Sequence, residues 1–110
     1  MRTTALLVGI ALVSGVLSQV AIAEMTPADH GFMEAMQVMD QGMKSAQPTG
    51  DADKDFVTMM LPHHQGAVDM SKVELQYGKD PELRSLAENI IKAQNYEIAQ
   101  MKAWLAKHGQ

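Results

Sequence analysis

Signals that end and restart helices divide the chain into three stretches of helical periodicity. The segment TPAD at 26–29 predicts an N-cap, a proline at the first helical position and an acid that closes a capping box. Turn residues at 47–50 and a capping Asp51 or Asp53 start a second helix, which Gly78 ends. The segment DPE at 80–82 starts a third, extending to about Lys107. No strand-like alternation occurs, so we expect an all-α chain, a small bundle of three main helices.

Residues 1–23 have the layout of a secretory signal peptide. Arg2 precedes an apolar run at 5–17, and the small-residue site AIA at 21–23 comes directly before Glu24. The run is shorter than the roughly 20 residues that a membrane span needs, although an uncleaved anchor is the alternative. We therefore expect export across the inner membrane to the periplasm, no membrane attachment after cleavage, and one helical domain at 24–110.

The composition narrows the possible partners and ligands. The formal net charge is −4 and no basic cluster occurs, so we expect no nucleic-acid partner. The absence of cysteine excludes disulfides and thiolate metal sites. Ten methionines in 110 residues are the anomaly. Those of the first helix recur with Phe32 at helical spacing, and we expect this stripe to pack in the core; it consists of Met36, Met39 and Met43.

Pro62 stands inside the second helix, directly before His63 and His64. Proline removes the bond to the carbonyl of Thr58 and clashes with that turn, at a cost of about 3 kcal/mol, so we expect a kink or a break there. His63 falls on a broad face that also carries methionines, whereas His64 lies about 100° further round the helix. The methionines of that face are Met59, Met60 and Met70.

Two polar residues interrupt the apolar stripe of the third helix. Gln94 and Glu97 stand between Ile90 and Met101 at core spacing. Buried polar groups need partners, and a facing imidazole or a bound cation would supply one. Whether this face meets the histidines within one chain or across a dimer stays open.

The residue types favour a soft metal. Thioether sulfur is a poor ligand for zinc, magnesium or calcium and suits copper(I), or silver(I) as its analogue, and imidazole also suits copper. Zinc would have only His63, His64 and Glu97. A b-type haem held by His63 and a methionine is a further alternative. No Glu-x-x-His, His-Glu-x-x-His or glycine-rich phosphate motif occurs, so we expect no enzyme.

Three segments resemble a known family. They are FxxMMLPHHQGAxxM from Phe56, DPEL from Asp80 and AQxxEIxxMxxWL from Ala93. Together they resemble the secreted bacterial domain-of-unknown-function family numbered three hundred and five. That family is described as ferritin-like and includes CopM-like periplasmic copper-binding proteins. The resemblance implies copper binding through Met60, His63, His64, Met70 and Met101, with Met59, Gln94 and Glu97 as weaker or supporting candidates.

Two functions follow as expectations. The first is a periplasmic copper(I)-binding protein for copper buffering, trafficking or tolerance, whose partners are the metal ion, another copy in a homo-oligomer, or a copper-handling protein. Its strongest ligand set is Met60, His63 and Met70, while His64 either starts a second site or serves packing. The second is a metal-free helical interaction module that self-associates or binds a partner helix through its methionine-rich faces, with His63 paired to Glu97.

Overall fold

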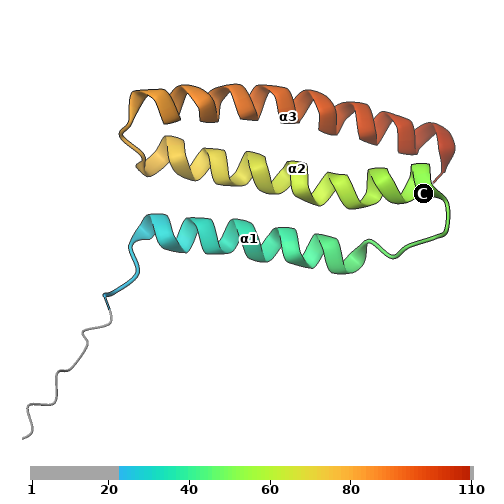
Figure 1. Cartoon of the computed structure of the whole chain (residues 1–110), viewed down its shortest axis with the longest axis horizontal. Helices are drawn as coiled ribbons and strands as arrows, with labels where there is room; N and C mark the ends of the chain where they lie inside the picture. The colour runs from blue at the N-terminus through green and yellow to red at the C-terminus, as the bar shows by residue number, and fades with distance from the viewer. Residues whose placement is uncertain (1–22, 110) are drawn as a thin grey trace, which may run out of the picture.

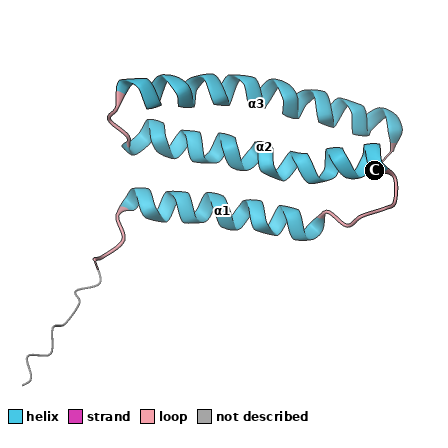
Figure 2. Ribbon diagram, in the orientation of Figure 1, coloured by secondary structure: helices cyan, strands magenta, loops and turns pink. Residues whose placement is uncertain are grey.

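The computed structural model describes residues 23–109. It contains three α-helices, α1 at Pro27–Ser45, α2 at Ala52–Tyr77 and α3 at Pro81–His108, and no strand within the described residues (Figure 2). The predicted all-α class with three main helices is confirmed. The expected signal peptide lies, except for Ala23, outside the described residues. No helix within 23–109 is long and apolar enough to cross a membrane.

The helices begin where the local capping signals predict. The Thr26 hydroxyl accepts from the Asp29 amide at 3.1 Å, while the Asp29 carboxylate accepts from the Thr26 amide at 2.7 Å, which completes the capping box. Asp51, rather than Asp53, caps α2, and Asp80 caps α3 with Pro81 next to it. Each cap satisfies backbone N–H groups that the first turn of a helix leaves without partners.

The three helices lie side by side in chain order, with α2 in the middle and successive helices antiparallel (Figure 1). α2 packs against both neighbours, whereas no Cα atom of α1 lies within 8 Å of one in α3. The bundle is therefore an open layer, and Val68 of α2 is its largest fully buried side chain.

Small residues set the distance between α1 and α2. A Cβ atom on Gly42 would lie 2.9 Å from the Cβ of Pro62, and one on Gly66 would lie 2.8 Å from the Sδ of Met39. Because the backbones approach so closely, Ala35 is the buried residue of α1. The expectation that the methionine stripe fills the core is wrong for Met36, which is 54% exposed.

Larger apolar side chains join α2 to α3. Val57, Met101 and Leu105 form a buried cluster. The partly buried residues packed against that cluster are Met60, Leu61 and Trp104. At the other end of the same pair, Arg84 donates from Nη1 to the carbonyls of Leu75 at 2.7 Å and Gly78 at 3.0 Å, which ties α3 to the end of α2.

Pro62 does not break α2. The helix is continuous from Ala52 to Tyr77, so of the two alternatives raised by this proline, the break is wrong. The Pro62 ring packs against Gly42 of α1, where the missing side chain leaves room for it. This contact offsets part of the cost of an internal proline.

Candidate metal site between α2 and α3

A pocket of about 510 Å³ lies between α2 and α3 and brings together four of the sequence-predicted site residues. Those four are Met60, His64, Glu97 and Met101. The other lining residues are Asp53, Phe56, Val57, Gln100 and Trp104. The third helix therefore meets the histidine segment within one chain.

His64 is held in a defined orientation. Its Nδ1 atom lies 3.1 Å from the Met60 carbonyl oxygen. A carbonyl can only accept, so Nδ1 donates in this bond, and a proton on Nε2 would be donated to Glu97, whose carboxylate also only accepts. Nε2 contacts the Glu97 carboxylate, and this contact becomes an ion pair when His64 is protonated. The His64 side chain is 16% exposed and that of Glu97 is 51% exposed.

Met60 and Met101 bring sulfur to the same pocket from opposite helices. Met101 is buried in the cluster with Val57 and Leu105, and Met60 packs against that cluster. Met101 is therefore shielded from bulk water, whereas Met60 is half-buried. A thioether offers a soft lone pair and carries no charge, so these side chains can hold a soft cation without adding a buried anion.

His63 and Met70 lie outside this pocket. Both are exposed on α2, and Met70 is 40% exposed. Met59 is half-buried and also lies outside it. One step along a helix turns the side chain by about 100°, so His64 points to α3 while His63 points to solvent. The pairing expected between His63 and Glu97 is made by His64 instead.

Gln94 lies on α3 one turn before Glu97. Its side-chain oxygen Oε1 is buried and has no hydrogen-bond partner among residues 23–109. A buried acceptor without a partner costs free energy, about 1–3 kcal/mol in typical cases. Gln94 does not line the α2–α3 pocket, so the partner expected for it from the sequence is not found there.

Two polar residues of the pocket were not among the sequence candidates. Asp53 and Gln100, both exposed, also line it. The sequence could have indicated Asp53, because it shares one side of α2 with three other lining residues. Steps of four, three and four residues join it to Val57, Met60 and His64.

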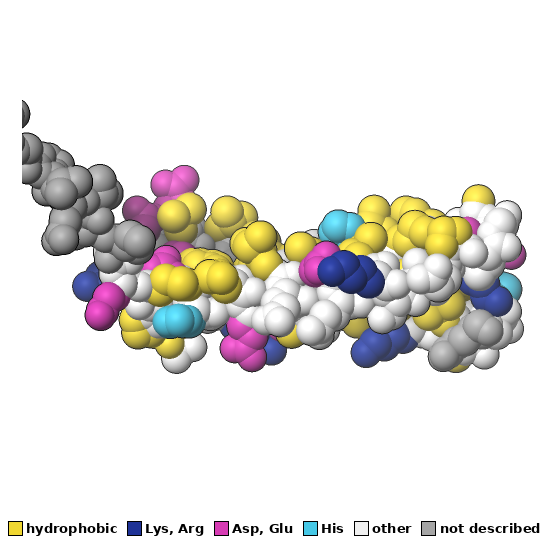
Figure 3. Space-filling view, turned by 90° about the horizontal axis from the view of Figure 1, so that it is seen from below, with side chains coloured by type: hydrophobic (Ala, Val, Ile, Leu, Met, Phe, Trp, Pro, Cys, Tyr) yellow, Lys and Arg dark blue, Asp and Glu magenta, His cyan; other side chains and the backbone are white. Residues whose placement is uncertain are grey.

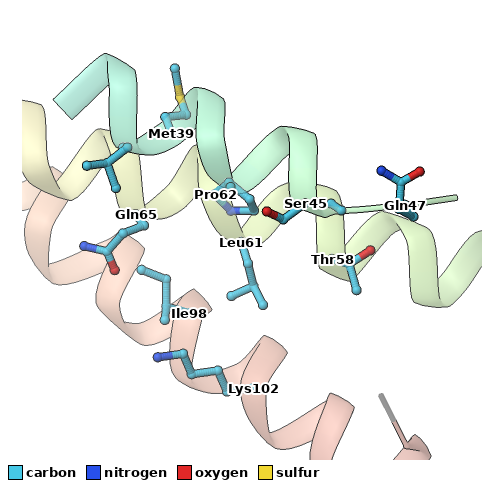
Figure 4. A pocket seen from close by; sticks show the side chains of 13 residues that line it. Met39, Ser45, Gln47, Thr58, Leu61, Pro62, Gln65, Ile98 and Lys102 are labelled. Atoms are coloured by element: carbon cyan, nitrogen blue, oxygen red, sulfur yellow. The ribbon is translucent and has the colours of Figure 1, made fainter. Parts of the chain in front are cut away.

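A larger groove of about 630 Å³ runs over α2 between α1 and α3 (Figure 4). Leu61 and Pro62 lie between Met39 on one side and Lys102 on the other. Its lining contains no histidine and no carboxylate, and the Lys102 ammonium would repel a cation. For metal binding the smaller α2–α3 pocket is therefore the better candidate, because its lining carries the donor atoms.

Histidine, cysteine and carboxylate side chains alone do not form a metal site in the described part of the chain. No group of three or more His, Cys, Asp or Glu side chains there could hold a metal ion. A metal held in the α2–α3 pocket by three protein ligands would thus need at least one donor of another kind, such as a methionine sulfur or the side-chain oxygen of Gln100.

Comparison with known proteins gives a family and names no activity. Over 53 residues the chain is 42% identical to "Uncharacterized protein L153" of Acanthamoeba polyphaga mimivirus. The match covers 48% of this chain and 35% of that protein, so the chain spans about a third of the length of this curated relative. The family described as "Domain of unknown function (DUF305)" matches residues 12–105. The chain therefore belongs to the DUF305 family.

Proposed function

We propose that the chain binds copper(I) in the α2–α3 pocket through Nε2 of His64 and the sulfur atoms of Met60 and Met101. The observation that carries this proposal is the hydrogen bond from His64 Nδ1 to the Met60 carbonyl. Metal-binding histidines commonly donate their second ring nitrogen to a carbonyl or carboxylate, which fixes the ring and directs the other nitrogen to the metal.

Glu97 has a specific part in this proposal. In the metal-free protein its carboxylate contacts Nε2, the atom that would coordinate copper(I). About half of the Glu97 side chain is exposed, so the carboxylate can move into water when Nε2 takes a metal. It would then remain near the site as a counter-charge or an additional oxygen ligand.

The donor set favours copper(I) and its analogue silver(I). Two thioethers and one imidazole match a soft monovalent cation, whereas zinc prefers thiolate, imidazole and carboxylate in a tetrahedral array. Met70 and His63 lie apart from this set, so we assign them no ligand role in the pocket. The metal would be the cargo of the protein, and we propose a binding role rather than catalysis.

The expected signal peptide places this function in the periplasm, where copper buffering, trafficking or tolerance would use such a site. Methionine and histidine ligands suit that compartment because they do not form disulfides, as cysteine ligands would. Asp53 and Gln100 line the same pocket and offer polar groups to an incoming copper-handling protein.

Competition for copper(I) against a chromophoric chelator under anaerobic conditions tests the proposal. We expect the His64→Ala, Met101→Leu double variant to lose at least about tenfold in affinity, equal to about 1.4 kcal/mol. The matched control is His63→Ala, Met70→Leu, which makes the same kinds of change outside the pocket and should compete like the unaltered protein. Equal loss in both variants, or no competition by the unaltered protein, refutes the proposed site.

A further inference from the structure

The two faces of the helical layer are chemically unlike. α2 contacts α1 through Pro62 and Gly66 and contacts α3 through Val57 and His64, on roughly opposite sides at about 100° per residue. Between these two seams, one side of α2 carries Phe56, His63 and Met70 at seven-residue spacing, all exposed. The other side carries Thr58, Gln65 and Lys72 at the same spacing.

The neighbouring helices continue the apolar side. Val38 of α1 lines the groove on the polar side. Met36 lies about 160° round the helix from Val38 and therefore on the apolar side. Trp104 of α3 lines the α2–α3 pocket with Phe56. Leu86 lies five full turns before Trp104 and therefore on the same side of α3. Seen from the α1 side, hydrophobic side chains gather along the upper edge of the molecule, with a histidine among them (Figure 3). We call the surface formed by Met36, Phe56, His63, Met70 and Leu86 the apolar face.

The apolar face is large for a chain of this size. Its four apolar side chains are between 40% and 59% exposed. A large side chain presents roughly 200 Å² when extended, so together they leave roughly 400 Å² in water. A standard protein–protein interface buries about 800 Å² from each partner. Half-buried methionines beside these residues, Met43, Met59 and Met60, can supply part of the difference.

We propose that the apolar face packs against the same face of a second copy of this chain. Stable helical domains enclose their core between two layers, and the described helices form one. A second copy supplies an identical layer through a two-fold axis. His63 stands near the midpoint of α2, so this axis brings the two His63 side chains together.

The distribution of charged side chains over the two sides of α2 favours self-association through the apolar face. The exposed side chains of the α2 stripe, Phe56, His63 and Met70, carry no carboxylate or ammonium, and half-buried Glu74, one turn beyond Met70, is the charged residue on this side of α2. The opposite side of α2 carries Asp69 and Lys72, and Lys102 of α3 lines the groove there. Burying those charges would cost free energy, so self-association uses the apolar face.

Sedimentation equilibrium of the full chain, purified as the host processes it and kept with a chelator, tests this proposal. We expect a dimer at concentrations of about 10 µM, which corresponds to about 7 kcal/mol of association free energy. Met36→Lys and Met70→Lys should each weaken it at least about tenfold, because a charge would be desolvated. Val38→Lys and Gln65→Lys are matched controls on the polar side and should leave the dimer unchanged. Circular dichroism checks that each variant stays helical.

A monomer at concentrations of several hundred µM would overturn the proposal, as would a dimer that only the control substitutions disrupt. A monomer whose mass shows that residues 1–23 remain attached would indicate that this segment, and not a second copy, covers the apolar face. That result would also overturn the proposal. Because the measurement excludes metal, a monomer that still binds copper(I) refutes only the dimer. A dimer that fails to bind copper(I) refutes only the function proposed above.

Discussion

Replacing Gly42 with alanine measures how closely α1 approaches α2. At an exposed helical position this change stabilises a protein by about 1 kcal/mol, because alanine is the better helix former. Here the new Cβ would lie 2.9 Å from the Cβ of Pro62 and 3.2 Å from its Cγ. A proline ring cannot rotate away, so the helices must separate. Overpacking of this kind costs about 1–3 kcal/mol, and we expect a net loss of about 1 kcal/mol.

Gly66→Ala is the matched comparison. Its new Cβ would lie 2.8 Å from the Sδ atom of Met39, at the flexible end of a side chain that can change rotamer. We therefore expect Gly66→Ala to be less harmful than Gly42→Ala. Thermal unfolding followed by circular dichroism resolves the difference, since 1 kcal/mol shifts Tm by about 4–8 °C in a domain of this size. A Gly42→Ala variant that melts above the unaltered protein would show that the Pro62 ring does not set the approach of α1.

Three further outcomes are expected. Pro62→Ala should raise the free energy of unfolding by up to about 3 kcal/mol in urea denaturation, because it restores a donor inside α2; a loss would mean that ring packing outweighs the helix defect. Hydrogen bonds from the Thr49 side chain and backbone lower the pKa of Asp55, so its contribution exists above the ordinary carboxyl pKa and disappears as pH falls through the lowered one. Asp55→Asn should therefore lower Tm at neutral pH, with the gap closing as the pH falls below the ordinary carboxyl pKa, and a gap that persists in strong acid would contradict this. Silver(I) at about 100 times its Kd should add about 2.7 kcal/mol, or roughly 10–20 °C in Tm, for the unaltered protein and for Met70→Leu; an equal shift in Met101→Leu would count against the pocket.

Local signals explain why the helices were predictable. Capping by Thr26, Asp51 and Asp80 depends on residues within one turn, and Gly78 ends α2 for an equally local reason. The turn expected at 47–50 and the helix end expected at Gly78 agree with the structure for that reason.

The side on which each helix packs was not available from local signals. Both histidines stand on α2, and the sequence alone favoured His63, because more methionines share its face. α2 has two seams on opposite sides, and the seam with α3 selects His64. In α1 the contact with α2 is made by Gly42 against Pro62 and by Met39 over Gly66, whereas Met36 is exposed, so the hydrophobic stripe read as core packs only in part.

The proposal that His64 supplies the nitrogen ligand is tested most directly by X-ray absorption at the copper edge of the copper(I)-loaded protein. It predicts sulfur scatterers together with one nitrogen scatterer, the nitrogen contribution being lost in His64→Ala and kept in His63→Ala. Loss of the nitrogen contribution in His63→Ala with its retention in His64→Ala would contradict the account and move the metal from the α2–α3 pocket to the exposed face of α2.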